Sequence, residues 1–361
     1  MKKAIFILIL VALMLQLSAC ASVFNKDYIS VKDIVDTPKE IEADKFMQAN
    51  NYLELKLAIT RLITEHAEGG SIDLRTYSGD INRDIAAACR EVSTNSLLGA
   101  YSVDYISYDL DRIVAYYDAT IFISYKKTAE EVSDIISVAT AGGVKEELSR
   151  ALLGLTPHVV IMANNSALDE RGIEKLIKEQ YLKEPLILIK QPKADITVYS
   201  GSGNSRIYEM TFDYGGAAAK IIGMQKTLAE KAKKAASEVL ALEDRARAQG
   251  LLNYLISACA YEKDGPKTAW SALIDGKADS EGIALAFKAL CDEAMLECVV
   301  VEGRYNKQQH YWNIVKIGGT YVHADIARVA EKGAGPFLVP DTAMRNEYWW
   351  DYQDYPTSDS K

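Results

Sequence analysis

The segment between residues 279 and 326 constrains the fold more than any other part of the chain. It opens with Asp279 and Ser280, a pair typical of a helix start, and its apolar residues then recur at helical spacing (Ile283, Phe287, Leu290 and Ala294). Strands are expected at 297–301, 310–317 and 320–326, with the tight turn of Gly318 and Gly319 between the last two. This order predicts an α+β domain.

Three polar side chains of this segment are expected to meet. Residues two apart in a strand share a face, so Tyr321, His323 and Asp325 should point the same way. Pairing of neighbouring strands would bring Asp325 beside His310, and the helix start would bring Ser280 to His310. Ser280, His310 and Asp325 are therefore expected to lie close together.

This segment resembles the transglutaminase-like superfamily, which has a papain-related fold. That family typically reads Cys-Glu-Gly-Tyr-Ala at a helix start, His-Ala-Trp-Asn on one strand and Tyr-His-Val-Asp on the next. The matching stretches here are Ser280–Ala284, His310–Asn313 and Val322–Asp325, and the flanking stretches TAWSAL, LCDEAMLECVVVEG and FLVPDTAM also match. The resemblance covers about residues 226–356 and implies a papain-like domain, with no metal or organic cofactor, over 223–361.

The sequence departs from the family at the nucleophile. In the family a cysteine attacks the carbonyl, and a helix N-terminus and an imidazolium stabilise its thiolate. Ser280 replaces that cysteine, and a hydroxyl is far too basic to ionise in the same way. The carboxylate of Asp279 would further oppose negative charge there. Neither Cys291, about three helical turns away, nor Cys259 can substitute.

Three functions remain open. In the one we favour, the domain is catalytically silent and binds peptide or cell-envelope polymer. In the second, Ser280, His310 and Asp325 form a working triad for hydrolysis or acyl transfer on peptide or amide bonds. In the third, the chain is a structural surface protein that binds through its N-terminal region.

Residues 45–222 read as a duplicated α+β region. The order strand-helix-strand-strand occurs twice, with a helix before each unit, and the stretches DRIVAYYDATIFISY and NSRIYEMTFDY take equivalent places. A hairpin is expected at Asp109–Asp111 and an extended segment at Leu186–Ile189. The helix-rich stretch 226–248 is expected to begin the next domain.

The first residues predict a targeting signal rather than part of a folded domain. Two lysines precede an apolar run, Ala4–Leu17, which is too short to span a bilayer and is typical of a signal peptide. Leu17-Ser18-Ala19-Cys20 is similar to a bacterial lipobox. We expect a signal peptide at 1–19, a lipidated Cys20, a tether at 20–44 and an extracytoplasmic, membrane-anchored protein.

The composition narrows the remaining classes of protein and kinds of site. The 361 residues are 49% hydrophobic and 25% charged, as in globular proteins, and the net charge of −9 argues against a general nucleic-acid binder. Four scattered histidines and the lack of CxxC spacing give no metal motif. Cys291 and Cys298 could pair, although Cys89, Cys259, Cys291 and Cys298 are more simply buried apolar residues. The aromatic stretch 348–355 could form a binding platform, but we favour packing over the core.

Overall fold

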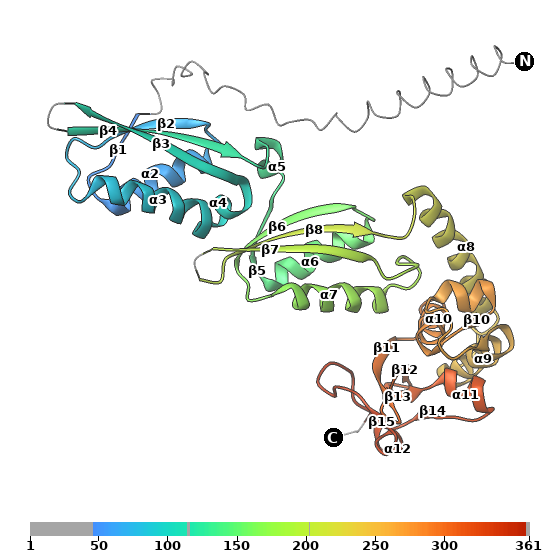
Figure 1. Ribbon diagram of the computed structural model, residues 1–361. Coiled ribbons are helices and arrows are strands. Elements are labelled where there is room, and N and C mark those ends of the chain that lie inside the picture. The colour runs from blue at the N-terminus through green and yellow to red at the C-terminus, as the bar shows by residue number, and fades with distance from the viewer. Residues whose placement is uncertain (1–45, 114–115, 202, 359–361) are drawn as a thin grey trace, which may run out of the picture. The chain divides into compact units, whose positions relative to one another are not determined.

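The computed structural model describes residues 46–113, 116–201 and 203–358 (Figure 1). By their contacts, the residues from Met47 onward belong to one compact unit. The signal peptide expected at 1–19, the lipidated Cys20 and the tether at 20–44 lie outside the described residues. No helix within the described ranges has both the length and the apolar character needed to cross a membrane. The α+β class expected from the sequence is confirmed.

The N-terminal part contains two α+β repeats that share the order strand-helix-strand-helix-strand-strand, apart from one additional short helix in each. The first repeat consists of β1 (Phe46–Gln48), α2 (Tyr52–Thr64), β2 (Gly69–Asp73), α3 (Ile81–Asn95), α4 (Leu97–Ser102), β3 (Val103–Ile113) and β4 (Tyr116–Tyr125). The second consists of α5 (Ala129–Ser133), β5 (Ile136–Thr140), α6 (Ala141–Leu153), β6 (His158–Asn165), α7 (Glu170–Lys183), β7 (Lys193–Ser200) and β8 (Arg206–Asp213). Their sheets have corresponding strand orders, β1-β2-β4-β3 and β5-β6-β8-β7, so each repeat has one more strand than expected.

A tyrosine near the end of each repeat shows how closely the two correspond. The Tyr125 hydroxyl donates to the carbonyls of Leu62 and Ala67, at sequence separations of 63 and 58 residues. The Tyr214 hydroxyl donates to two carbonyls at the same separations, 63 and 58. In both repeats the accepting carbonyls flank the end of the helix that precedes the central strand. The repeats therefore share a side-chain device as well as a topology.

Two expectations for this region are wrong. Asp109–Asp111 is not a hairpin: Asp109 and Asp111 pair with Thr120 and Asp118 inside the β3–β4 ladder, which continues to the pair Ile113 and Tyr116. Alternating aspartates can occupy the polar face of a strand, so their polarity did not mark a turn.

Leu186–Ile189 is likewise not extended. Backbone N–H groups of Ile187 and Leu188 donate to the Glu184 carbonyl, and the segment forms turns. Leu188 and Ile189 are buried although they belong to no strand. Their apolar character predicted burial correctly, but burial alone does not specify a strand.

The C-terminal part surrounds one buried helix. Its elements are α8 (Ala218–Ser237), α9 (Asp244–Ala258), β9 (Ala260–Tyr261), the π-helical turn η2 (Ser271–Asp275), β10 (Lys277–Ala278), α10 (Ser280–Glu293), β11 (Cys298–Tyr305), β12 (Gln308–Ile317), β13 (Thr320–Ala324), α11 (Ile326–Lys332), β14 (Phe337–Val339), α12 (Asp341–Met344) and β15 (Tyr348–Trp349). The main sheet has the antiparallel order β14-β13-β12-β11-β15. Strand β13, expected to extend from residue 320 to residue 326, ends at Ala324 because Asp325 caps α11.

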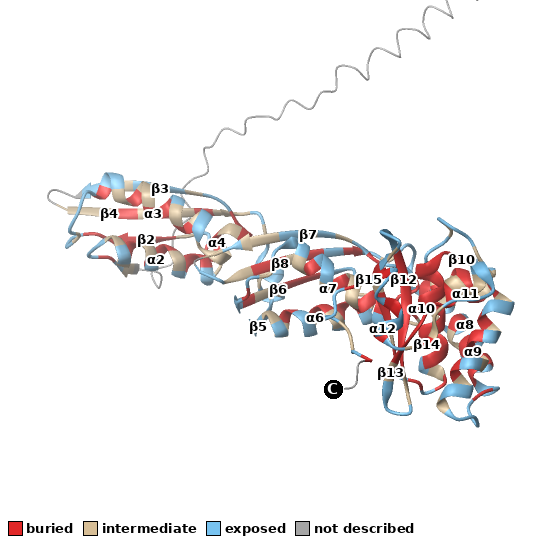
Figure 2. Cartoon of the chain, turned by 90° about the horizontal axis from the view of Figure 1, so that it is seen from below, coloured by how far each residue is buried: buried red, intermediate tan, exposed pale blue. Residues whose placement is uncertain are grey.

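Helix α10 is the centre of this part (Figure 2). Every residue from Ser280 to Cys291 is buried, so the helix is covered all round rather than along one stripe. Strands β11 and β12 pack on one side of it, and α8 and α9 contact it elsewhere. Helix α8, which begins at Ala218 and so spans the expected boundary at 222/223, packs on the C-terminal core. The position of the boundary stays a prediction.

The two largest apolar clusters of the chain differ in extent. One apolar cluster extends from Val144 in the second repeat to Leu338 in β14, whereas the first repeat has a separate cluster between Ala49 and Ile123. The four described cysteines are buried free thiols, as expected for small apolar residues (Cys89, Cys259, Cys291 and Cys298).

Candidate functional site

Ser280 is the first residue of α10. The Asp279 carboxylate caps the helix by accepting a hydrogen bond from the Gly282 N–H at 3.0 Å. Gly282 allows a close approach, because a Cβ there would lie 2.7 Å from the Ala278 Cβ and 3.0 Å from the Pro266 carbonyl oxygen. Cap and glycine together fix the helix start against the preceding loop.

His310 and Asp325 form a tightly held pair. His310 Nε2 lies 2.6 Å from Asp325 Oδ2, and the Tyr348 hydroxyl donates to the same oxygen at 2.7 Å. The other carboxylate oxygen accepts from the Arg328 N–H at 3.0 Å, as the cap of α11. Asp325 is fully buried. Three hydrogen bonds therefore fix the carboxylate, which in turn orients the imidazole.

Ser280 is near this pair but is not linked to it. Its hydroxyl oxygen accepts a hydrogen bond from the backbone N–H of Tyr311, the residue after His310, at 3.4 Å. Both Ser280 and His310 belong to the described residues, and no hydrogen bond joins their side chains. The structure thus brings the three expected residues into one region and connects two of them. Their catalytic roles stay a prediction.

A second buried chain of polar groups lies behind His310. The Trp312 indole donates to His323 Nδ1 at 2.9 Å, and His323 Nε2 lies 2.9 Å from Asp341 Oδ1. Because an indole N–H only donates, Nδ1 must accept, and the proton of a neutral His323 sits on Nε2 and points to Asp341. The Trp312 ring in turn stacks with the His310 ring, with centroids 6.2 Å apart. His323 is therefore a buried structural residue.

Asp341 was not singled out from the sequence. Although burial acts the other way, hydrogen bonds from Ser358 and His323 hold the pKa of Asp341 below its usual value. The sequence signal that could have indicated Asp341 is its place in the stretch FLVPDTAM, which flanks the main motifs and also resembles the family.

Buried carboxyl groups flank Ser280. Burial raises the pKa of Asp279 and of Glu281, in the second case against the attraction of Lys178. Lys178 belongs to α7 of the second repeat, and its ammonium pairs with Glu281 while lying 5.3 Å and 5.1 Å from the ring centroids of Tyr181 and Tyr311. The second repeat therefore supplies a charge to the site, which no local sequence pattern indicated.

The aromatic tail mostly packs over the core, as favoured from the sequence. Tyr348 and Trp350 are buried in a cluster with Trp312, and the Tyr348 hydroxyl donates a hydrogen bond to Asp325. Trp349 is different, since 60% of it is exposed, and it lies beside the guanidinium of Arg304. Tyr311, in place of the family's small alanine, is buried on the side of Lys178.

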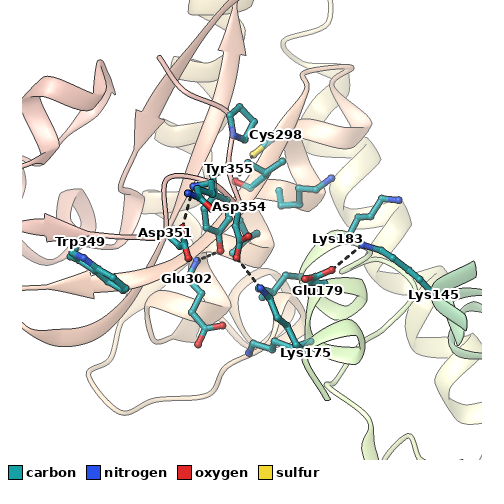
Figure 3. A pocket seen from close by; sticks show the side chains of 17 residues that line it. Lys145, Lys175, Glu179, Lys183, Cys298, Glu302, Trp349, Asp351, Asp354 and Tyr355 are labelled. Carbon is teal, nitrogen blue, oxygen red and sulfur yellow. Dashed lines mark hydrogen bonds and ion pairs between the residues drawn. The ribbon is translucent and has the colours of Figure 1, made fainter. Parts of the chain in front are cut away.

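Two cavities lie near these residues. The larger, of about 720 Å³, has lysines of α6 and α7 on one side and Glu302, Trp349 and Tyr355 on the other (Figure 3). The smaller, of about 490 Å³, is lined by Glu281 and Tyr311, next to Ser280. Within the described residues, no group of three or more His, Cys, Asp or Glu side chains could hold a metal ion.

Comparison with known proteins identifies the C-terminal part. Residues 223–326 match the model of the transglutaminase-like superfamily. They form a transglutaminase-like domain. It contains Ser280, His310 and Asp325, but Lys178 and Asp341, which support the site, lie outside the matched range. The expected resemblance is thus confirmed over this range.

Solved structures with similarity to the chain include two relevant ones. One is from Cytophaga hutchinsonii and is described as a "Putative Cysteine Protease", with 15% identity, a TM-score of 0.26, and coverage of 41% of this chain and 63% of that one. The other is a "TGase", with 14% identity, a TM-score of 0.27, and coverage of 57% and 60%. The alignments thus span less than two thirds of either chain. No curated protein matches the sequence.

Proposed function

We propose that this chain is an extracytoplasmic lipoprotein whose transglutaminase-like domain binds peptide or cell-envelope polymer without turning it over. One observation carries the proposal: the Ser280 hydroxyl is hydrogen-bonded to the Tyr311 backbone and not to His310, while the His310–Asp325 pair is intact. The chain keeps the architecture of a catalytic site but not the contact that would activate its nucleophile.

The charges around Ser280 support catalytic silence. A serine nucleophile needs a base within hydrogen-bonding reach, since the hydroxyl does not ionise by itself. The buried carboxyl group of Asp279 lies directly before it in the chain. When charged, this group opposes the negative charge that develops during attack on a carbonyl.

Binding is supported by the cavities beside the site. The smaller offers lysines, carboxylates and tyrosines next to the helix start. The larger, which shares Lys178 and Glu302 with it, adds further lysines and the largely exposed Trp349. Such a mixed lining suits the amide, hydroxyl and charged groups of peptides and cell-envelope polymers.

The binding proposal is tested with the mature chain. Purified peptidoglycan, and peptides released from it, are expected to be retained by the chain and recovered chemically unchanged after long incubation. Release of cleaved or cross-linked products, abolished by His310→Ala, would contradict catalytic silence.

The membrane anchor is tested in cells by Cys20→Ala. The parent chain is expected in the membrane fraction with a lipid-labelled cysteine. The variant is expected to lose both label and membrane association. Unchanged fractionation of the variant would contradict the lipoprotein proposal.

A second candidate function is a serine hydrolase or acyltransferase that uses Ser280, His310 and Asp325. It is favoured by the 2.6 Å contact of His310 with Asp325, the arrangement that orients a general base. A fluorophosphonate probe that labels the parent chain but not Ser280→Ala would establish this function. Equal, background labelling of both would exclude it.

The third candidate, a structural surface protein, is favoured by the separate core of the first repeat. It predicts that ligand protection from amide exchange maps only to residues 45–222. Protection around α10 and β12 would contradict it.

A further inference from the structure

The smaller cavity beside Ser280 is lined by more lysines than carboxylates. Its lining is made of three lysines, two glutamates, two tyrosines and three further polar residues (Lys178, Lys190, Lys267, Glu281, Glu302, Tyr181, Tyr311, Gln191, Thr268 and Gln309). The lining thus has one more ammonium group than carboxylate.

The charged partners within the cavity account for one lysine. Lys178 pairs with Glu281, and Glu302 accepts a hydrogen bond from the Gln309 amide at 2.8 Å. Lys190 and Lys267 are exposed, and among the described residues neither ammonium has an ion-pair or hydrogen-bond partner. Lys267 does attract the carboxylates of Asp279 and Glu281, since its charge acts to lower their pKa values against burial. Both ammonium groups keep their hydrogen-bond donors for a ligand.

The backbone around Lys267 is held next to the site helix. The Tyr181 hydroxyl donates to the Lys267 carbonyl at 3.0 Å, and the Asp279 N–H donates to the Pro266 carbonyl at 3.0 Å. Lys267 thus projects from a segment fixed between α7 and the residue before Ser280. Its position relative to the site is set by the fold, although its side chain is exposed.

From these observations we infer that the cavity binds the carboxylate of an acidic peptide, with Lys190 and Lys267 as its cationic partners and the peptide backbone beside Ser280. A peptide fits better than a simple anion, because the Gln191 amide nitrogen can donate and the Gln309 amide oxygen can accept hydrogen bonds from peptide groups. The other amide atoms of these two side chains are already hydrogen-bonded within the chain. The buried rings of Tyr181 and Tyr311 form the apolar walls. This inference rests on the proposed peptide-binding function.

The test uses the mature chain and an array of short peptides in matched pairs. Members of a pair differ only by Glu or Asp against Gln or Asn, or by a free against an amidated C-terminus. Exposed ion pairs are individually weak, so an acidic member is expected to bind about three- to tenfold more tightly than its neutral partner at low salt. In K190Q/K267Q this preference is expected to vanish.

A matched double variant controls for net charge. K193Q/K263Q removes two exposed lysines that do not line the cavity and is expected to keep the preference. Equal binding of acidic and neutral peptides by the parent, or equal loss in both double variants, would overturn the carboxylate site and leave the proposed function standing. Binding of no peptide, or only of peptide-free saccharide fractions, would overturn this inference and count against peptide binding as well.

Discussion

At the residue scale, the chemistry of the site depends on one atom, the oxygen that Ser280 has in place of a sulfur. The helix start, its capping residue Asp279 and the His310–Asp325 pair are arranged around it. A thiol has a pKa of about 8.5, which a helix end and an imidazolium can lower to neutral pH, whereas the pKa of a hydroxyl is far too high. The proposed silence of the site is therefore expected to be reversible by a single substitution.

Ser280→Cys is expected to create a reactive thiolate. Its alkylation by iodoacetamide should follow an apparent pKa below about 8.5, and a fluorogenic peptide amide should be cleaved in a thiol-dependent way. Ser280→Cys/His310→Ala is the control and should lose both properties. An ordinary alkylation profile with no amide cleavage would show that the surrounding groups no longer support nucleophilic attack.

Gly282→Ala tests the close approach that fixes the helix start. Its Cβ would meet backbone atoms of Pro266 and Thr268 at 3.0 Å, which cannot yield without moving the loop. We expect a loss of about 1–3 kcal/mol in the free energy of unfolding, measured with urea. Gly223→Ala in α8 is the matched control, since nothing lies within 4 Å of its Cβ and a helical alanine stabilises. Equal stability of both variants would contradict the packing described here.

At the scale of elements, the contact of α7 with α10 joins the second repeat to the site. It is made through Lys178 and Glu281, with the rings of Tyr181 and Tyr311 around the ammonium. Burial destabilises the ionised form of Glu281 more than the attraction of Lys178 stabilises it, since the pKa of Glu281 is raised despite the ion pair. The contact thus favours a defined arrangement at some cost in stability at neutral pH.

The pH dependence of unfolding should reveal this cost. A raised carboxyl pKa means that the folded state keeps a proton which the unfolded state releases, so stability is lost as pH rises from about 4 through the raised pKa of Glu281. Glu281→Gln cannot lose a proton, and its urea midpoint should therefore improve relative to the parent as pH rises. The hydrogen bond from Tyr321 lowers the pKa of Glu297, so Glu297→Gln should show the opposite sign. Parallel curves for the parent and Glu281→Gln would contradict the assignment.

The elements also show what sequence patterns can and cannot predict. Helical spacing from Ile283 to Ala294 located α10, although the helix is buried all round and not along one stripe. The strand expected at 310–317 is β12, whose residues are buried continuously from His310 to Val315 rather than alternately. The patterns failed at Asp109–Asp111 and Leu186–Ile189, where polarity and burial do not distinguish strand from turn. They did not indicate Lys178, since a contact across 103 residues between two α+β parts leaves no local signal.

At the scale of the whole molecule, the apolar cores divide the chain differently from its repeats. The second repeat shares one continuous core with the transglutaminase-like domain, while the first repeat has its own. A small cluster of Tyr101, Val160 and Ile207 connects the two repeats. Because cooperativity follows shared burial, the second repeat should unfold together with the C-terminal part rather than with its structural counterpart.

The tyrosines that mark the repeats provide a matched pair of variants for this prediction. Tyr125→Phe and Tyr214→Phe each remove a hydroxyl that has two acceptors at equivalent positions, so each should cost about 0.5–1.5 kcal/mol. Calorimetry of the parent should show two transitions. Tyr125→Phe should lower only the transition of the smaller unit, by about 2–12 °C, and Tyr214→Phe only that of the larger unit, by a smaller amount, because the same free energy shifts a larger unit less. If Tyr214→Phe instead lowered the transition that Tyr125→Phe lowers, the two repeats would unfold as one body, and the continuous core across the second repeat would not govern the cooperativity of the chain.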